Sequence, residues 1–388
     1  MHIPWNMGRI ALAFVAAAGL NVVSAGIGSA ADDRGVRVVR FLGEQRLPYG
    51  MEVKGTTLGG LSGIDRDPRT GTWYFISDDR WRYQPARFYT GRLDFNGVSG
   101  AFTGVSIDKV TTLSRADGSP YPAYGKADAA DPESIRYDPV SRKILWAQEG
   151  DRPEEGRPDI PVSDLSVRWT GADGRYRGEL QIPRNLRMTN ENHGPRRDFG
   201  FEGLTFAPRS IAAIVEGPRF EDGPSPTTKH GAPARIMVWN RKGQPLAQYA
   251  YPIDPLPAAP IPPSGHTDSG VSEILAIDDH RYLALERSWI EGVNYRVKLY
   301  EIDLREATNI LTRDSLMTRM FYRPVEKRLL LDLSTERRQP TQNLESLAWG
   351  PRLHTGEQVL VIGSDDNFSE GEATQFLAYA LRGLPDGR

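Results

Sequence analysis

The sequence repeats one pattern five times, at intervals of 69 to 72 residues. Each copy begins with a glutamate or serine at the head of a short apolar run, passes through a turn, and ends with a second apolar run followed by acidic residues. An interval this constant indicates a repeat architecture, in which each unit buries its apolar face against its neighbours. The leading positions are Ser62, Glu133, Glu202, Glu273 and Glu345.

Each repeat continues with two further strand-like runs. In the second repeat these lie at residues 164–170 and 177–183, around a turn that contains Asp173 and Gly174, a pair that suits a tight hairpin. Four strands per repeat and no convincing long helical period indicate an all-β fold. Four-stranded units repeated radially are the blades of a β-propeller, so we predict five blades of about 70 residues.

The fifth repeat supports closure of the ring, because it ends one strand short while residues 37–45 have no blade of their own. We therefore predict that this N-terminal strand completes the last blade beside residues 374–381. A repeat near 70 residues is long for a blade, so six blades remain the alternative. The extra length is expected in loops rich in proline and glycine, such as residues 217–233 and 252–265, where proline denies strand hydrogen bonds.

Residues 1–31 have the features of a secretory signal peptide. They carry Arg9, an apolar run from Ile10 to Val23, and small residues up to a cleavage point near Ala30 or Ala31. The alternative is a membrane anchor, which the shortness of the apolar run disfavours. We predict export to the periplasm or the extracellular space, with residues 32–388 as one mature domain that has no membrane span.

Composition excludes several classes of function. The 388 residues include no cysteine, which rules out disulfides, thiolate metal sites and a cysteine nucleophile. A formal net charge of −2 argues against nucleic acid as a partner. No G-x-S-x-G elbow occurs, so a serine-hydrolase triad has little support. We expect a monomer that binds a small molecule.

The acidic residues of the repeats are expected to meet at one end of the propeller. The first strand of a blade lies innermost and the second is antiparallel to it, so the head of the first and the tail of the second share one mouth of the channel. Carboxylates gathered there repel one another unless cations intervene. The candidate catalytic residues are Glu133, Glu202, Glu273 and Glu345. The candidate metal ligands are Asp78, Asp79, Glu149, Glu202, Glu216, Glu273, Glu286, Glu345 and Asp365, with Asp366 adjacent.

Two kinds of cation could neutralise this ring. Oxygen-only sites suit hard divalent ions, with Ca²⁺ first. Alternatively, arginines that follow the acidic tails neutralise it, or the acids only fix the hairpins by bonding to the backbone. His266 precedes the fourth repeat, and Ser62 breaks the symmetry on a side where a substrate or a water could enter. The candidate substrate-binding residues are Arg80, Arg152, Arg219, Arg287 and His193, with Arg82 nearby.

The motifs together resemble the bacterial family described as having esterase-like activity of phytase. They are residues 61–80, 131–139 with 145–150, 200–208 with 215–218, 272–279 with 284–289, and 343–351 with 362–368. The resemblance covers residues 50–381. It implies a secreted β-propeller that hydrolyses phosphoesters or carboxylesters, and it carries no individual catalytic residue over to this chain.

Two hypotheses from different classes follow. In the first, the protein is a metal-assisted hydrolase of a small anionic ester or phosphoester: Ca²⁺ offsets charge and activates water, arginines hold the anion, and a ring carboxylate acts as base. In the second, the protein is a non-catalytic propeller whose mouth binds a ligand or another protein, since one fold hosts both kinds of function.

Overall fold

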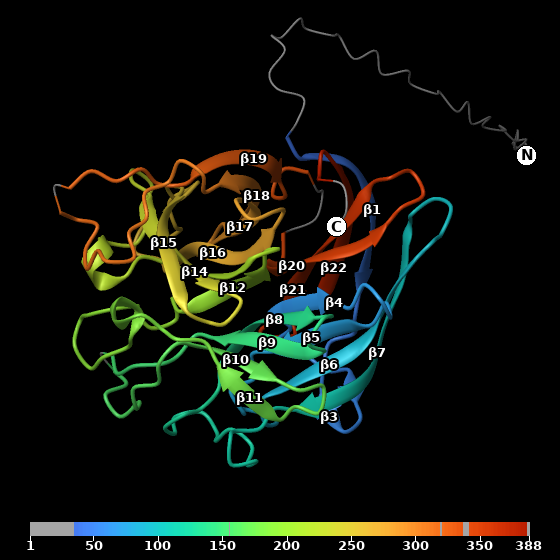
Figure 1. Cartoon of the computed structure of the whole chain (residues 1–388), viewed down its shortest axis with the longest axis horizontal. Helices are drawn as coiled ribbons and strands as arrows, with labels where there is room; N and C mark the ends of the chain where they lie inside the picture. The colour runs from blue at the N-terminus through green and yellow to red at the C-terminus, as the bar shows by residue number, and fades with distance from the viewer. Residues whose placement is uncertain (1–34, 155, 319, 337–340, 386–388) are drawn as a thin grey trace, which may run out of the picture. The chain divides into compact units, whose positions relative to one another are not determined.

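The computed structural model describes residues 35–154, 156–318, 320–336 and 341–385. Five four-stranded antiparallel sheets surround a common axis, which confirms the predicted all-β, five-bladed propeller (Figure 1). Blade 1 contains β4 (Gly63–Arg66), β5 (Trp73–Ser77), β6 (Arg87–Phe95) and β7 (Phe102–Thr112), and blade 2 contains β8 (Pro132–Asp138), β9 (Lys143–Gln148), β10 (Ser166–Thr170) and β11 (Tyr176–Glu179). Blade 3 contains β12 (Phe201–Phe206), β13 (Ser210–Val215), β14 (Ala232–Asn240) and β15 (Pro245–Ile253), and blade 4 contains β16 (Thr267–Ala276), β17 (Arg281–Ile290), β18 (Asn294–Asp303) and β19 (Glu326–Asp332).

Blade 5 joins the two ends of the described chain. Its strands β20 (Asn343–Arg352), β21 (Gln358–Asp365) and β22 (Gln375–Arg382) are followed by β1 (Arg37–Arg46), drawn in blue against the red β22 in Figure 1. The two strands are antiparallel, with Phe41 opposite Tyr379 and Gln45 opposite Phe376. The predicted closure by the N-terminal strand is therefore confirmed.

The remaining regular elements are short. A ribbon pairs β2 (Glu52–Val53) with β3 (Thr56–Thr57), and 3-10 turns occupy η1 (Arg184–Leu186) and η2 (Phe220–Asp222). Within the described ranges there is no sixth four-stranded sheet, so the six-blade alternative is not supported. No helix in these ranges has the length and apolar character needed to cross a bilayer. The predicted signal peptide, residues 1–31, lies outside the described residues and stays a prediction.

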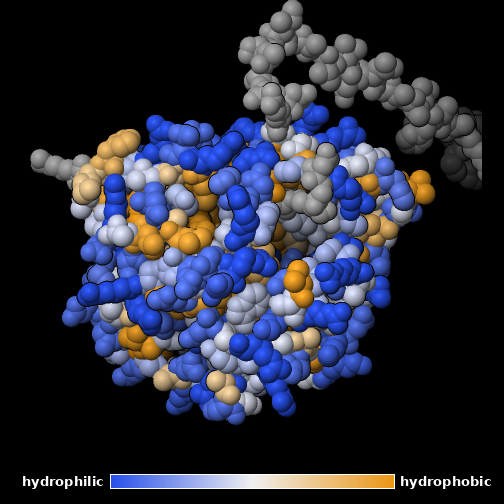
Figure 2. Space-filling view, in the orientation of Figure 1, coloured by the Kyte–Doolittle hydropathy of each residue, from blue (hydrophilic) through white to orange (hydrophobic). Residues whose placement is uncertain are grey.

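The core lies between the blades. Each sheet is covered on both faces by its neighbours, so second strands such as β13 are buried along their whole length and read as continuous apolar runs rather than alternating ones. In blade 3, which lies between blades 2 and 4, the rings of Phe201 and Trp239 pack edge to face with their centroids 5.8 Å apart. Both belong to the largest buried cluster. Figure 2 shows hydrophilic residues over most of the face in view.

A buried ion pair lies among the innermost strands. The guanidinium of Arg136 donates to the carbonyl oxygens of Ile64 at 2.5 Å, Leu204 at 2.5 Å and Ile274 at 3.3 Å. These carbonyls belong to blades 1, 3 and 4, and Arg136 itself belongs to blade 2. The carboxylate of Glu273 neutralises it at 2.8 Å. One charged pair therefore ties together the inner strands of four blades.

Candidate functional site

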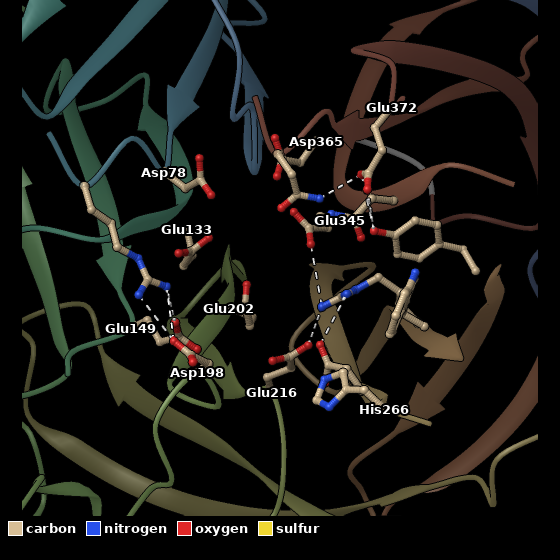
Figure 3. Close-up of a pocket in the computed structure, with 17 residues that line it drawn as sticks. Asp78, Glu133, Glu149, Asp198, Glu202, Glu216, His266, Glu345, Asp365 and Glu372 are labelled. Carbon is tan, nitrogen blue, oxygen red and sulfur yellow. Dashed lines mark hydrogen bonds and ion pairs between the residues drawn. The ribbon is translucent and has the colours of Figure 1, made fainter. Parts of the chain in front are cut away.

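The leading glutamates of three blades stand on β-bulges. In blade 2, Pro132 pairs with Gln148 and Ser134 pairs with Ala147, which leaves Glu133 without a partner across the ladder. The same irregularity occurs at Glu202 and at Glu345. A bulge re-aims the side chain of the extra residue. All three glutamates line one pocket at the mouth, as predicted (Figure 3).

Blade 4 differs, and the expectation for Glu273 is corrected. There the bulge residue is Ser272, because Val271 pairs with Glu286 and Glu273 pairs with Leu285. Glu273 is thus one residue further along, below the mouth, where its carboxylate accepts from the backbone N–H of Leu204 at 2.9 Å and pairs with Arg136. Burial raises the pKa of Glu273 to about 7 against the pull of Arg136. Its carboxylate links blades and lies outside the pocket that the other three leading glutamates line.

The second strand of each blade also supplies one residue to the mouth. In the blades with a bulge, this residue directly follows the one that pairs with the residue before the bulge. Blade 4 again breaks the pattern, because an arginine stands where the others have an acid. Glu286, one residue earlier, points to the other face of the sheet. It accepts from Tyr251 Oη at 3.0 Å and from Lys327 Nζ at 2.8 Å, so its predicted place among the metal ligands is corrected. The five mouth residues are Asp78, Glu149, Glu216, Arg287 and Asp365.

A third position, two residues before the bulge, was missed by the sequence reasoning. Blades 1, 3 and 4 have glycine there, and at Gly200 a Cβ atom would lie 2.0 Å from the carbonyl oxygen of Glu149. Blades 2 and 5 have Asp131 and Asn343 instead. The Oδ1 atoms of both are buried with no hydrogen-bond partner among the described residues. Aligning this position across the repeats would have found Asp131.

These positions enclose a pocket of about 360 Å³, here called the acidic cup (Figure 3). Blade 4 forms its wall on one side, because β16 and β17 run past the bulge and add His266, Asp268 and Trp289 to the lining. Ten carboxyl groups and two arginines line the cup. The lining residues are Asp78, Arg80, Glu133, Glu149, Asp198, Glu202, Glu216, His266, Asp268, Arg287, Trp289, Tyr295, Asn343, Glu345, Asp365, Asn367 and Glu372.

The two arginines neutralise only part of this charge. Arg80 contacts Asp131 at 2.7 Å and Glu149 at 3.3 Å, and Arg287 contacts Glu216 at 2.6 Å. Their own pKa values rise well above the ordinary value because of these carboxylates. The predicted neutralisation by arginine is therefore present, at Arg80 and Arg287, but two guanidinium groups face ten carboxyls.

The cup favours protonated carboxyl groups when no other cation is present. Burial raises the pKa of each of seven acids, and repulsion from neighbouring carboxylates adds to the rise at most of them. For Glu202, the neighbours that raise the pKa are Glu216, Glu149 and Glu345. The seven acids are Asp78, Glu133, Glu149, Glu202, Glu216, Glu345 and Asp365.

The donor set fits a hard metal ion. Two groups of acids each place one oxygen per residue within 4.8 Å of the others, and Glu149 belongs to both: Asp131 with Glu133, and Glu202 with Glu216. On the other side of the cup, Asp365 is only 1% exposed, yet its Oδ1 has no hydrogen-bond partner among the described residues. Every donor is a carboxylate oxygen, the ligand that Ca²⁺ and Mg²⁺ prefer. These buried acidic clusters could therefore hold a metal ion.

Two residues predicted to belong to the acidic ring, Asp79 and Asp366, instead bind groups of the neighbouring loops. Asp79 pairs with Arg87 at 2.6 Å and accepts from the backbone N–H of Arg82 at 2.7 Å. Asp366 accepts from the backbone N–H of Gly60 and from Thr374 Oγ1, each at 2.9 Å. For these residues the alternative that the acids fix local structure is the correct one.

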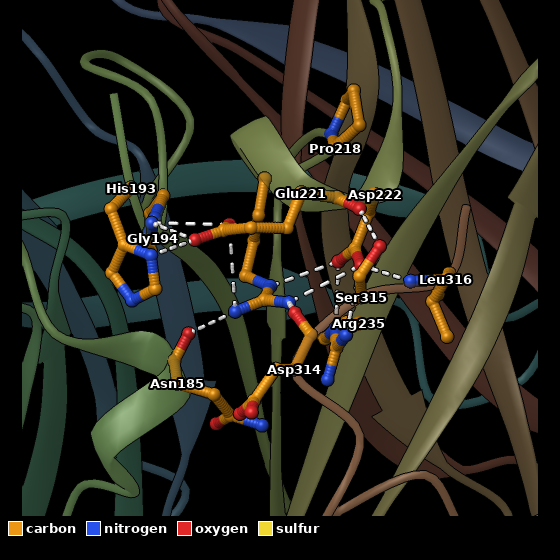
Figure 4. Close-up of polar contacts among 12 residues, drawn as sticks. Asn185, His193, Gly194, Pro218, Glu221, Asp222, Arg235, Asp314, Ser315 and Leu316 are labelled. Atoms are coloured by element: carbon orange, nitrogen blue, oxygen red, sulfur yellow. Dashed lines mark hydrogen bonds and ion pairs between the residues drawn. The ribbon is translucent and has the colours of Figure 1, made fainter. Parts of the chain in front are cut away.

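Arg152, Arg219 and His193 also lie outside the cup, contrary to the expectation that they face a substrate there. Arg152 donates to the carbonyl oxygens of His193 and Pro195, each at 3.0 Å. Arg219 forms an ion pair with Asp222 at 2.9 Å, and the ring of His193 pairs with Glu221 (Figure 4). The guanidinium and imidazole groups are engaged in packing loops, which short-range sequence spacing does not reveal.

Comparison with known proteins adds a family to this geometry. A family model described as Phytase-like, esterase-like activity of phytase, matches residues 56–368. No curated protein matches the chain. An α-L-arabinofuranosidase from Lactobacillus brevis is 9% identical over 83% of this chain and 91% of its own, with a TM-score of 0.42. A protein of unknown function from Dyadobacter fermentans DSM 18053 is 11% identical over 90% and 100%, with a TM-score of 0.38. Likenesses this slight say nothing of function.

Proposed function

Because the chain belongs to the Phytase-like family, described as having esterase-like activity of phytase, we propose that it is a cation-dependent hydrolase of small esters, anionic phosphoesters first and carboxylesters second. One observation carries this proposal: ten carboxyl groups converge on a cup that supplies only two arginines. A site of this composition repels an anionic ester until cations occupy it, and with cations it attracts one.

Two groups of acids would hold the cation, for which Ca²⁺ is the first choice: Asp131 with Glu133 and Glu149, and Glu149 with Glu202 and Glu216. A bound Ca²⁺ would offset the charge of the substrate and lower the pKa of a bound water. Arg80 and Arg287, which both line the cup, would donate hydrogen bonds to the ester oxygens.

Glu345 is the carboxylate best placed to act as base. It lines the cup but belongs to neither cation group, and the nearest guanidinium atom, on Arg287, is 3.6 Å away. Burial raises its pKa, which brings a carboxylate closer to the operating pH at which a general base is effective. Glu345 would accept the proton of the attacking water on a carboxylate oxygen and later return a proton to the leaving group.

The test is the initial rate of hydrolysis of p-nitrophenyl phosphate and of p-nitrophenyl acetate by the full mature chain. Hydrolysis of at least one ester is expected to cease with a chelator and to return with Ca²⁺. Glu345→Gln keeps the shape of the side chain and is expected to lower kcat by about 10²-fold or more. Glu306→Gln, an exposed residue paired with Arg323, is the matched control and should leave the rate unchanged.

Calcium binding without turnover of either ester would contradict the catalytic part of the proposal and favour a non-catalytic binding protein. Equal rates with chelator and with Ca²⁺ would contradict the cation dependence. We also propose that the protein is exported and acts as a monomer. N-terminal sequencing of exported material should then begin near Asp32, and a product that still begins at Met1 would contradict export.

A further inference from the structure

A second recess opens beside the acidic cup and has a different charge. Its volume is about 250 Å³, and it shares Asp78, Arg80, Asp198 and Asn367 with the lining of the cup. The two spaces are therefore adjacent. The recess adds three arginines, whereas the cup beyond the shared residues is dominated by acids. Its lining residues are Asp78, Asp79, Arg80, Arg82, Arg157, Arg197, Asp198, Asn367 and Phe368, and it is here called the arginine recess.

The arginines gather around one aromatic ring. The guanidinium carbons of Arg82 and Arg157 lie 6.0 Å and 5.2 Å from the ring centroid of Tyr124. Arg197 donates to Tyr124 Oη at 2.8 Å and is neutralised by Asp151. In contrast, Arg82 and Arg157 are exposed, and among the described residues no carboxylate forms an ion pair with either. Both guanidinium groups thus lie beside the ring of Tyr124, in the recess next to the cup.

The backbone around the recess is strained. Trp81, Asp198, Asn367 and Phe368 have φ values of 55°, 54°, 47° and 50°, in the left-handed region that residues with a side chain seldom adopt. Backbone strain of this kind clusters at ligand sites. The strained turns also expose an aromatic surface, because the ring of Phe368 stacks at 4.8 Å on Tyr83, which is 50% exposed.

We propose that the arginine recess binds a second anionic group of the substrate, a carboxylate or a phosphate remote from the scissile ester. This inference rests on the proposed hydrolysis in the acidic cup. Arg82 and Arg157 would bind the remote anion with charge-assisted hydrogen bonds, and Phe368, which lines the recess, would pack on the part of the substrate between its two anionic ends. With a cation in the cup, both spaces would attract anions: the ester to be cleaved would lie beside the cation in the cup, and the second anion beside the arginines of the recess.

The test compares two aryl esters that differ only in a remote anion, phenyl phosphate and 4-carboxyphenyl phosphate. The quantity measured is the ratio of kcat/KM for the carboxylated ester to that for the plain one. The double variant Arg82→Ala, Arg157→Ala should lower this ratio by about tenfold or more, the equivalent of 1.4 kcal/mol of discrimination. Comparing variants cancels any difference in leaving-group chemistry between the esters.

Two further variants separate charge from folding. Arg82→Lys with Arg157→Lys keeps both positive charges and should retain most of the ratio. Arg175→Ala removes a 74% exposed arginine from the turn between β10 and β11 and should leave the ratio at the wild-type value. A lysine variant with the low ratio of the alanine variant, or an alanine variant with the wild-type ratio, would overturn the proposal that the arginine recess binds the second anion.

Failure of the proposed function would look different. If the wild-type protein cleaves neither ester, the proposed hydrolysis in the cup is contradicted. Titration calorimetry with both esters then still measures whether the recess binds the second anion. Binding of 4-carboxyphenyl phosphate that exceeds binding of phenyl phosphate, and loses that excess in the double alanine variant, would support the second anion site. Equal binding of the two esters by the wild-type protein would overturn it.

Discussion

Buried carboxylates occur in two regions of the propeller with opposite surroundings. Asp222, in a buried ion cluster at η2, lies between Arg219 and Arg235, and these guanidinium groups lower its pKa against the effect of burial (Figure 4). Glu133 and Glu202, in the acidic cup, are buried too, but their pKa values rise well above the ordinary value. The sign of the shift therefore depends on which counterions the chain supplies, not on burial alone.

The difference shows in which region the chain itself neutralises the buried carboxylates. The carboxylate of Asp222 accepts hydrogen bonds from the guanidinium groups of Arg219 and Arg235. It also accepts the backbone N–H of Leu316 at 3.0 Å, so both of its oxygens have donors. In the cup, ten carboxyl groups share Arg80 and Arg287. The ion cluster needs nothing from solution, whereas the cup needs protons or an external cation. The predictions below separate the two regions, starting from the largest effect.

Replacement of Asp222 should be severe and independent of calcium. Asp222→Asn keeps the shape but leaves the buried Arg235 without a counterion and Arg219 with only Glu221, 3.7 Å away, so we expect a loss of about 3–5 kcal/mol in the free energy of unfolding. Urea denaturation measured with Ca²⁺ and with a chelator should give the same loss. Asp303→Asn removes the partner of the exposed Arg305 and should cost under about 1 kcal/mol. A loss at Asp222 that Ca²⁺ reverses would contradict the separation of the two regions.

Calcium should stabilise the wild-type protein by a smaller amount, through the cup. An ion that binds only the folded state raises the free energy of unfolding by about 2.7 kcal/mol at a hundredfold excess over its dissociation constant. Glu149→Gln removes the acid shared by both cation groups, so it should abolish most of this increase. Thermal melting with and without Ca²⁺ measures the difference.

The control for the calcium response is Glu306→Gln, which lies outside the cup and should melt like the wild-type protein under both conditions. Only the difference between the two melts is compared, because Glu149 also accepts the backbone N–H of Gly200 at 3.0 Å and its replacement changes the baseline. If melting of the wild-type protein is indifferent to both Ca²⁺ and chelator, the cup is neutralised by protons and arginines, and no cation site exists there.

Much of the fold could be predicted from the sequence, because the repeated pattern itself indicates the blades. The interval, the paired apolar runs and the unpaired strand at residues 37–45 suffice to give five blades and their closure by β1 beside β22. These features are local in sequence and recur, so each repeat supports the interpretation of the others. The layer of acids at the mouth followed from strand direction alone.

The membership of the site could be predicted only in part, because it depends on single-residue register. A shift of one residue moves a side chain to another layer, and the sequence offers Ser272 and Glu273 side by side with no local signal for which one occupies the bulge. The partners of Arg152 and Arg219 come from loops tens of residues away, such as the carbonyls of His193 and Asn185. Such contacts arise from how loops pack over the blades, which periodicity does not encode.

The last effect that separates the two regions is a pH dependence that calcium should suppress. Groups with raised pKa values bind more protons in the folded than in the unfolded state between the ordinary range near 4 and the raised values. The free energy of unfolding therefore falls as pH rises through that window, by about 1.4 kcal/mol per pH unit for each extra proton bound. Carboxylates with lowered pKa values, such as Asp222 and Asp254, lose their contribution only as pH falls below their ordinary pKa and through the lowered one.

Chelated protein should therefore be more stable at pH 5 than at pH 8, and urea denaturation across this range measures the slope. With saturating Ca²⁺ the cup carboxylates are ionised at both pH values, so most of the slope should vanish. A smaller part should remain, because Glu273 has a pKa of about 7 and lies outside the cup, next to Arg136. Glu273→Gln is expected to reduce that part and to leave the calcium-sensitive slope in place. Burial also raises the pKa of Asp65 and Glu286 outside the cup, so some of the residual slope should persist. A chelated protein whose stability is flat or rises from pH 5 to pH 8 would show that the cup carboxylates are neutralised within the chain, as Asp222 is.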